Sequence, residues 1–491
     1  MSDEVVKTGI AGLDQVLGGG FRERQSILIT GEPGTGKTVL CNHIAFLHAG
    51  AGHPTVVATL TSETQDKLLG SLGSFGFFRE EVIGEQLFLV SLYSWLKRGP
   101  DDLRRELTEV ARSRHARLLV VDGLRAVRDV WKDEALVREF IYEMCAGLAA
   151  TGCLVLMTTE YRMSRVIDYP EATAVDGIIS LAVQEENDRA YRRLQVAKLR
   201  GQDHLTGRHV MRIAHGGIEI YPRLEAQVRS KPYHPARPRR RAQFGIAKLD
   251  ELLHGGIPTP STTVLAGTTG VGKTLLSLQF LAEGAAKGER GVYLSFSEEP
   301  EPLIGRMERI GVRLRPLVES GMVRIEYRAP LNLEADELLA HLLECVASTG
   351  ATRCVLDAVD ELERAVPEGP RLTSLLTALS LKLRSAGVSL LALKKIGELT
   401  SAGIDFADTA ISTIVENLMV IRKVELRGHM RRVLAVMTMR DTAFETEVHE
   451  FEVSDSGIRV GRIIDDAEGV LSRSDPRLIS RANDGNDSDP R

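Results

Sequence analysis

The chain has 491 residues, of which 43% are hydrophobic and 26% charged, and its formal net charge is −5. This composition is ordinary for a globular protein, the length exceeds one typical hydrophobic core, and the mildly acidic charge argues against broad coating of nucleic acid. The five scattered cysteines lack C-x-x-C pairs and no apolar run reaches membrane-spanning length, so we expect buried thiols, a cytoplasmic location and no membrane contact.

Short apolar runs alternate with helical periodicity along both halves of the chain. In the first half the expected strands are residues 26–30, 55–60, 118–122 and 153–158, with a helix over 39–46. Their counterparts in the second half are strands over residues 263–266, 291–296, 354–357 and 388–393, with a helix over 275–281. This pattern predicts an α/β fold with a mainly parallel sheet covered by helices on both faces, which binds ligands at the carboxyl ends of its strands.

The two halves are copies of one another. Lys273 follows Lys37 by 236 residues, and Asp250 follows Asp14 by the same interval. A repeat this long indicates two whole domains in tandem and not a solenoid. We expect a first domain at 1–225, a basic and proline-rich linker at 226–243, a second domain at 244–462 and a flexible tail at 463–491. The basic run in the linker could also contact nucleic acid or an acidic partner, although its composition favours a solvated linker.

Each half contains the phosphate-loop pattern G-x-x-x-x-G-K-[ST], at residues 31–38 and 267–274. In this pattern backbone amides cradle phosphates, the lysine reaches the β- and γ-phosphates, and the hydroxyl ligates Mg²⁺. The sequence therefore predicts two sites for a nucleoside triphosphate, with ATP and Mg²⁺ as the expected ligands. The expected nucleotide-binding residues are Gly31, Gly34, Thr35, Gly36, Lys37 and Thr38, and Gly267, Thr269, Gly270, Val271, Gly272, Lys273 and Thr274.

Acidic residues follow the strands that should end near these loops. Asp122 and Asp357 each close an apolar strand about ninety residues after the loop, where P-loop enzymes keep a carboxylate for Mg²⁺. We expect them to hold the metal together with Thr38 and Thr274.

A second acidic position follows the strand after the loop helix. In the second half it holds Glu298 and Glu299, and an acidic residue there can activate a water or hydroxyl for attack on the γ-phosphate. In the first half Ser62 replaces the first glutamate, which leaves Glu63. We therefore expect the first domain to bind ATP firmly and hydrolyse it slowly.

These residues together resemble the KaiC family of clock ATPases and autokinases, within the RecA-like superfamily. The resemblance covers about residues 5–462 and rests on the paired loops and on Thr8-Gly-Ile-Ala-Gly-Leu-Asp14, Ser74-Phe-Gly76, Met157-Thr-Thr-Glu160 and Ala197-Lys198-Leu-Arg200-Gly201. It implies a homo-hexameric double ring with ATP at subunit boundaries. It also implies that Lys198 and Arg200 reach a neighbour's nucleotide, as an arginine finger does. The second domain keeps Arg440 and has Thr438 in place of the lysine.

The resemblance also implies an autokinase in the second domain. Ser412 and Thr413 align with the pair of residues that receives phosphate across the subunit interface, and Glu425-Leu-Arg427-Gly428 follows as in the family. We expect phosphorylation at one or both.

Two alternatives remain at this point. The chain could be a signalling scaffold in which nucleotide sets the assembly state and a protein partner reads the ring. It could also be a recombinase or helicase, but those need a basic channel or DNA-binding loops, and no cluster of basic and aromatic residues occurs outside the linker.

Overall fold

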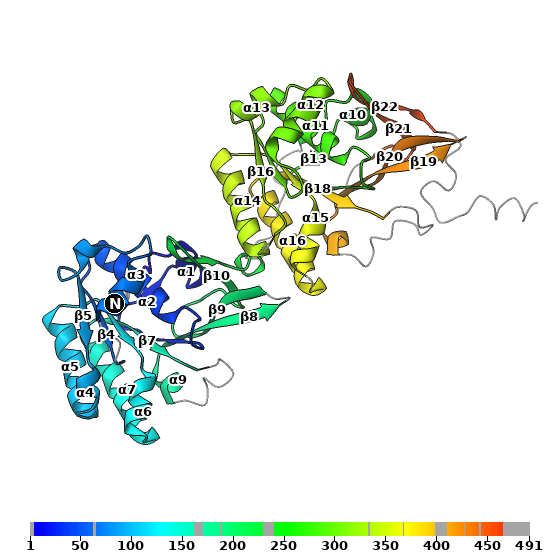
Figure 1. Ribbon diagram of the computed structural model, residues 1–491. Helices are drawn as coiled ribbons and strands as arrows, with labels where there is room; N and C mark the ends of the chain where they lie inside the picture. Colours follow the sequence, from blue (N-terminus) through cyan, green and yellow to red (C-terminus); the bar gives the residue numbers. More distant parts are fainter. Residues whose placement is uncertain are drawn as a thin grey trace, which may run out of the picture. The chain divides into compact units, whose positions relative to one another are not determined.

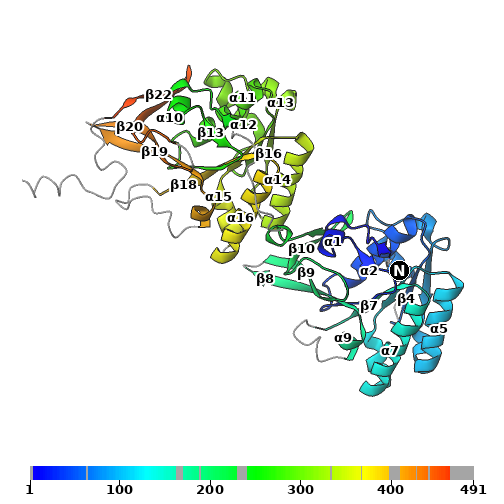
Figure 2. The ribbon, with the colours of Figure 1, turned by 180° about the vertical axis from the view of Figure 1, so that it is seen from behind.

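The computed structural model describes residues 4–61, 65–161, 170–186, 189–228, 240–331, 334–366, 368–397, 410–426, 428–440 and 443–464. The chain divides into two compact units, residues 1–227 and 228–491, here called domain one and domain two. Figures 1 and 2 show them from opposite sides. Each domain is built on a nine-stranded, mostly parallel sheet with helices on both faces, which confirms the expected fold class.

The sheet of domain one has the strand order β11-β10-β9-β8-β3-β7-β6-β4-β5. Strands from β8 to β5 in this order are parallel, and β9, β10 and β11 extend the sheet in antiparallel fashion. The strands are β3 (Ser26–Thr30), β4 (Thr55–Thr59), β5 (Leu87–Ser91), β6 (Leu118–Asp122), β7 (Leu154–Thr159), β8 (Gly177–Glu186), β9 (Arg189–Leu199), β10 (His209–Ala214) and β11 (Gly217–Tyr221). The four strands expected in this half are confirmed, whereas the antiparallel extension was not anticipated.

Successive residues of the buried strands face opposite sides, so domain one has a hydrophobic core on each face of its sheet. Ile27 and Ile29 pack towards one set of helices, and Leu28 packs towards the other. On the first face lie α1 (Ala11–Val16), α2 (Lys37–Gly50) and α3 (Gln65–Leu72). On the second lie α4 (Tyr93–Leu96), α5 (Pro100–Ser113), α6 (Arg125–Trp131), α7 (Glu134–Ala150) and α9 (Pro170–Ala174).

Domain two repeats this topology, with the strand order β16-β15-β17-β18-β14-β19-β20-β21-β22. Its strands are β14 (Thr262–Gly267), β15 (Gly291–Ser295), β16 (Val323–Tyr327), β17 (Arg353–Asp357), β18 (Ser389–Lys395), β19 (Asn417–Leu426), β20 (His429–Met439), β21 (His449–Ser454) and β22 (Gly457–Ile463). Helices α10 (Ala247–Leu252), α11 (Lys273–Ala286), α12 (Pro300–Arg309) and α13 (Arg315–Glu319) cover one face. Helices α14 (Ala335–Thr349), α15 (Val359–Ala365) and α16 (Gly369–Ser385) cover the other.

Short elements complete each domain. They are the strand pairs β1 (Val5–Val6) with β2 (Phe21–Arg22) and β12 (Arg240–Ala242) with β13 (Ile257–Thr259), and the 3₁₀ turns η1 (Glu80–Val82), η2 (Glu225–Gln227) and η3 (Ala410–Thr413). Strand β12 falls inside the expected linker. The guanidinium of Arg241 donates to the carbonyl oxygens of Leu253 and Gly256, each at 2.9 Å. The end of that segment is therefore part of domain two and not a solvated linker.

Side-chain placement confirms the expectation for the cysteines. The five cysteines are free thiols and all are buried, as expected. Both tryptophans, Trp95 and Trp131, lie in domain one. Among the helices that the structure describes, none combines the length and the apolar character needed to cross a bilayer.

Candidate nucleotide sites

Each phosphate loop joins the central strand of its sheet to the helix that follows, so that the loop lies at the carboxyl end of β3 or β14. The last loop glycine precedes the helix in a left-handed conformation, with φ of 100° at Gly36 and 107° at Gly272. A Cβ at Gly36 would lie 2.8 Å from Ile213, and one at Gly272 would lie 3.0 Å from Phe451. Only glycine suits both the backbone and the space, and the first amides of the helix remain available to an anion.

The loop lysines lie inside these cradles. Lys37 Nζ donates to the carbonyl oxygens of Gly31 at 2.8 Å and Glu32 at 3.0 Å. Lys273 Nζ makes the same contacts, to Gly267 at 2.6 Å and Thr268 at 2.8 Å. Burial lowers the pKa of both ammonium groups, and nearby carboxylates oppose the shift. Both loops thus present a buried cation and helix amides to the same point, a combination that suits phosphate.

The threonine after each lysine contacts the aspartate at the end of the neighbouring strand. Thr38 Oγ1 donates to Asp122 Oδ2 at 3.0 Å, and Thr274 Oγ1 donates to Asp357 Oδ2 at 2.9 Å. The structure brings together the hydroxyl and the carboxylate that the sequence assigned to Mg²⁺. Oxygen ligands of this kind are those that Mg²⁺ prefers, so the residues fit the ion.

A second hydroxyl group donates a hydrogen bond to each aspartate, and it comes from a different strand in each domain. In domain one, Thr158 at the end of β7 donates to Asp122 Oδ1. In domain two, the buried phenol of Tyr293 on β15 donates to Asp357 Oδ2 at 2.6 Å. Sequence reasoning missed both donors. Thr158 lay within a motif that we quoted, but Tyr293 carried no signal because strand tyrosines are usually core residues.

A hollow of about 510 Å³ in domain two is lined by β19, β20 and β21, and it includes Lys423, Phe451 and Val453. Phe451 and Val453 are the side chains that pack against Gly272, and Lys423 Nζ is 3.8 Å from the position of a Cβ on Gly270. The hollow is therefore beside the phosphate loop. Most of its lining is polar or charged, and its apolar part next to the loop, formed by Phe451 and Val453 near the ammonium group of Lys423, suits a nucleoside attached to the phosphates.

The expected catalytic glutamates of domain two follow β15. The Glu298 carboxylate forms an ion pair with Arg306 on α12. The backbone amide of Glu298 donates to Ser295 Oγ at 3.1 Å. Glu299 is exposed at the start of α12. Sequence reasoning missed Arg306, which lies on α12, whereas Glu298 precedes that helix. Ser62 and Glu63, the matching positions of domain one, lie outside the described residues.

Lys198 and Arg200 lie at the far end of domain one from its own phosphate loop. Lys198 Nζ donates to the carbonyl oxygens of Ala172 at 2.8 Å and Val175 at 2.6 Å, and Arg200 is exposed, with its guanidinium 4.0 Å from Asp176. Because β9 runs antiparallel to β8, its last residue pairs with the first residue of β8. Neither cation can reach the loop after β3 in the same domain.

Arg440, Ser412 and Thr413 occupy the same end of domain two. The amide of Arg440 donates to the carbonyl of Glu416 just before β19. Ser412 is half-buried and Thr413 is exposed, both in η3 against α16. Both residues therefore lie in a 3₁₀ turn and not in a strand.

The strand arrangement and the loop geometry define both domains as RecA-like P-loop domains. A family model described as the KaiC ATPase matches residues 6–225 and again residues 242–464. The chain therefore belongs to the KaiC family of ATPases, as the sequence motifs indicated.

Curated relatives extend over nearly the whole chain. Those described as circadian clock oscillator protein KaiC include one from Picosynechococcus that is 25% identical, with 96% of this chain and 92% of the relative covered. The protein of Parasynechococcus marenigrum is 25% identical, with 96% and 93% covered, and that of Prochlorococcus marinus is 24% identical, with 97% of both covered.

Proposed function

We propose that this protein binds ATP and Mg²⁺ in both domains and phosphorylates itself at Ser412, Thr413 or both, using the second-domain site of a neighbouring subunit. In domain one the loop residues 31–38 would hold the phosphates, with Thr38 and Asp122 on the metal. In domain two the loop residues 267–274 would do so, with Thr274 and Asp357. When bound, Mg²⁺ neutralises the charge that develops on the β- and γ-phosphates.

One observation carries the proposal that transfer occurs between subunits. Strand β14 pairs with β19 in parallel, so that Thr263 lies beside Asn417, and the phosphate loop follows Gly267. Ser412 and Thr413 precede Asn417 and are at the opposite end of the sheet. Four residues of strand span about 13 Å, so the acceptors cannot contact a γ-phosphate held by their own domain. Transfer would therefore need a second copy of the chain to supply either the nucleotide site or the acceptors.

The same geometry supports roles in trans for the cations at the amino ends of the strands. Arg200 and Arg440 lie at equivalent positions, beside Asp176 and Glu416 just before β8 and β19. In a ring they would meet the nucleotide of the next subunit and stabilise charge on its γ-phosphate. Lys198 would have to release the carbonyl oxygens of Ala172 and Val175 to join Arg200. We therefore propose a homo-oligomer, most simply a hexamer, that acts in the cytoplasm, where the five buried thiols stay reduced.

The chemical step requires a base next to the acceptor hydroxyl. The hydroxyl oxygen of Ser412 or Thr413 attacks the γ-phosphorus, the bond to the β–γ bridging oxygen breaks, and ADP leaves. A carboxylate at Glu298 or Glu299 accepts the hydroxyl proton. The ion pair with Arg306 holds the Glu298 side chain in place at the end of β15, where it could act as that base.

Two variants, each inactive alone, test this proposal. Glu298→Gln keeps both acceptor hydroxyls but loses the base, whereas a double Ser412→Ala, Thr413→Ala variant keeps the base and loses the acceptors. The two are mixed as dissociated subunits before ATP and Mg²⁺ are added, and intact mass is measured. We expect phosphate on the Glu298→Gln chain only. An unchanged mass for the wild-type protein rejects the kinase, and phosphate on the wild type but not on the mixed Glu298→Gln chain rejects transfer between subunits.

A nucleotide-dependent scaffold is the second candidate, and the serine at position 62 favours it for domain one. In that case ATP sets the assembly state and the ring is read by a protein partner. ATP turnover separates the two functions, because a scaffold needs binding but no hydrolysis in domain two.

A further inference from the structure

Three side chains with metal-binding atoms meet at the outer edge of the domain-two sheet. Glu326 lies on the edge strand β16, and His341 and Cys345 are one turn apart on α14. His341 Nε2 is 3.1 Å from Glu326 Oε2, and Cys345 Sγ is 3.5 Å from His341 Nε2. All three atoms lie within 4.8 Å of one another, and no other such group occurs among the described residues.

These separations match the edges of a tetrahedron around zinc. With ordinary bond lengths, two tetrahedral ligands lie about 3.3 Å apart for nitrogen and oxygen and about 3.5 Å apart for nitrogen and sulfur. Thiolate, imidazole and carboxylate are together the ligand set of Zn²⁺, and not of Mg²⁺ or Ca²⁺. Ionised Glu326 and Cys345 would also cancel the charge of a divalent ion.

The cluster is separate from the nucleotide site. Tyr293 belongs to the hydrophobic core on the face of the sheet that α11 covers, and Ile325 packs against this core. The strand residues nearest the phosphate loop belong to the same core. Glu326 follows Ile325 and points to the other face, where α14 lies. The equivalent place in domain one lacks these side chains, because Val90 occupies the position of Glu326 and α5 contains neither histidine nor cysteine.

Two arginines surround the cluster and have different effects. Arg324 Nε donates to Glu326 Oε1 at 2.6 Å, which orients the carboxylate and leaves Oε2 for a metal. Arg328, which is exposed, contacts His341 Nε2 at 2.9 Å and competes for that atom. Burial and the nearby Glu326 raise the pKa of the Cys345 thiol, so loading would release a proton.

We propose that Glu326, His341 and Cys345 form a binding site for a zinc-type divalent ion. Three protein ligands leave a fourth position for water or for a group from another molecule. The ion would join the edge strand β16 to α14, and Arg328 would move into solvent when it binds. The proposal does not depend on ATP binding or on the kinase.

Co²⁺ is the probe, because a cobalt–thiolate bond absorbs in the near ultraviolet and tetrahedral cobalt absorbs in the visible. Metal-free full-length protein should bind about one Co²⁺ per chain with both absorptions, and Zn²⁺ should displace it. Cobalt bound at an oxygen-lined nucleotide site gives no thiolate band. Absence of that band in the wild-type protein would overturn the proposal.

Three variants decide whether these residues are the ligands. Cys345→Ser should abolish the thiolate band, whereas the control Cys145→Ser, a buried thiol of domain one, should leave it unchanged. His341→Gln should weaken Co²⁺ binding, and Arg328→Gln should strengthen it, because the competing guanidinium is gone. If Cys345→Ser is misfolded by circular dichroism, the half-buried His341 and the exposed Arg328 still give opposite shifts. Equal affinity for wild type and both of these variants rejects the site.

Discussion

Domain one and domain two share a backbone plan, but the positions of the positive and negative residues beside their nucleotide loops are exchanged. In domain one, Arg125 on α6 donates to Glu160, just after β7, at 3.0 Å. At the equivalent places domain two has Asp360 on α15, which accepts from the amide of Lys395 at 2.9 Å and from Lys394 Nζ at 3.0 Å.

Both domains thus have an ionic contact between this helix and the end of the neighbouring strand. The helix supplies the positive residue in domain one and the negative residue in domain two. Glu160 opposes the lowering of the Lys37 pKa, whereas Lys395 adds to the lowering of the Lys273 pKa. Asp360 also opposes the lowering of the Lys273 pKa, so both loop lysines have carboxylates beside them and Lys273 has a second lysine nearby as well. A lysine beside the loop would stabilise charge that develops on phosphates, which is one reason to expect faster chemistry in domain two.

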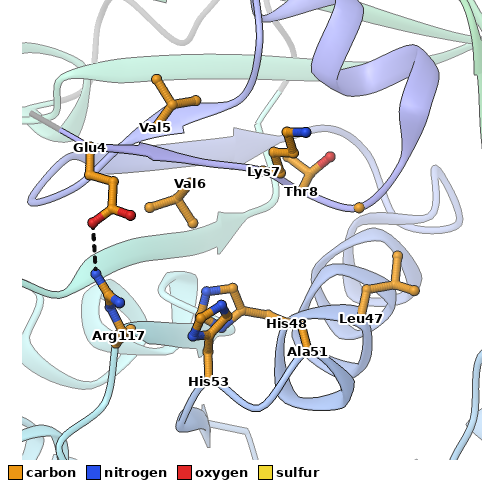
Figure 3. A pocket seen from close by; sticks show the side chains of 11 residues that line it. Glu4, Val5, Val6, Lys7, Thr8, Leu47, His48, Ala51, His53 and Arg117 are labelled. Carbon is orange, nitrogen blue, oxygen red and sulfur yellow. Dashed lines mark hydrogen bonds and ion pairs between the residues drawn. The ribbon is translucent and has the colours of Figure 1, made fainter.

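A second difference lies between the start of each domain and the helix after its loop. Domain one has a hollow of about 340 Å³ there, and Figure 3 shows the rings of His48 and His53 facing its interior, near the pair formed by Glu4 and Arg117. In domain two the Arg353 side chain fills the equivalent region. Its guanidinium donates to the carbonyl of Phe280 at 2.6 Å and to that of Gln243 at 2.8 Å, and it pairs with Glu289. Domain one thus has the buried His48 and the half-buried His53 where domain two has a buried arginine.

The largest expected difference between the domains is in turnover. Lys273→Ala should lower total ATP hydrolysis roughly 10²-fold, to the slow rate that we expect of domain one, because it removes the cation that meets the developing phosphate charge. The matched change Lys37→Ala should leave most of the rate. Steady-state phosphate release measures both. Equal losses in the two variants would show that the domains are catalytically alike.

Acid should destabilise domain one selectively. Burial lowers the pKa of His43 and of His48 to about 4, and it also lowers that of His209. Because the folded-state pKa lies below the unfolded value, stability is complete above pH 6.5 and is lost as the pH falls towards 4.

For His43 and His48 the loss should reach about 2 kcal/mol each by pH 5. The equivalent residues of domain two, Gln279 and Gly284, do not titrate. Hydrogen exchange between pH 6.5 and 5 can follow the domains separately, in a window where few carboxylates protonate. The variant His48→Gln should flatten the slope for domain one, and an unchanged slope would contradict this origin.

The buried phenol that donates a hydrogen bond to Asp357 should contribute more to stability than an exposed phenol does. Tyr293→Phe removes a buried hydrogen bond to a carboxylate and should destabilise domain two by about 1.5–3 kcal/mol. The control Tyr221→Phe removes an exposed hydrogen bond to Glu219 and should change stability by less than about 0.5 kcal/mol. Denaturant unfolding compares them. Similar effects from the two changes would mean that Thr274 alone fixes Asp357.

The smallest expected effect concerns two helical glycines of domain two, for which substitution by alanine should change the stability in opposite directions. A Cβ at Gly284 would lie 2.5 Å from Arg353 Nε, so Gly284→Ala should destabilise the domain by about 1–3 kcal/mol. At Gly305 the space is open, and Gly305→Ala should stabilise by up to about 1 kcal/mol. Thermal melts measure both. Stabilisation by both changes would show that Arg353 can move aside.

The sequence predicted those parts of the molecule that depend on local pattern. The central strands, both loops and the contacts of Thr38 with Asp122 and of Thr274 with Asp357 follow from apolar runs and fixed spacing. It did not predict partners brought together only by the fold, such as Tyr293 with Asp357 or Arg306 with Glu298. It also missed the antiparallel strands β9 to β11, because their half-exposed residues lack the continuous apolar pattern that marks the central strands.

The placement of Trp95 and Trp131 has a practical consequence. Since neither occurs in domain two, light absorbed by indole is emitted from domain one alone. The indole of Trp131 donates to the carbonyl of Leu96 at 3.0 Å and meets Phe140 edge-on, so its emission wavelength will respond when that packing opens. The intact chain therefore contains an intrinsic optical reporter for one half, against which the tryptophan-free half can be compared without any label.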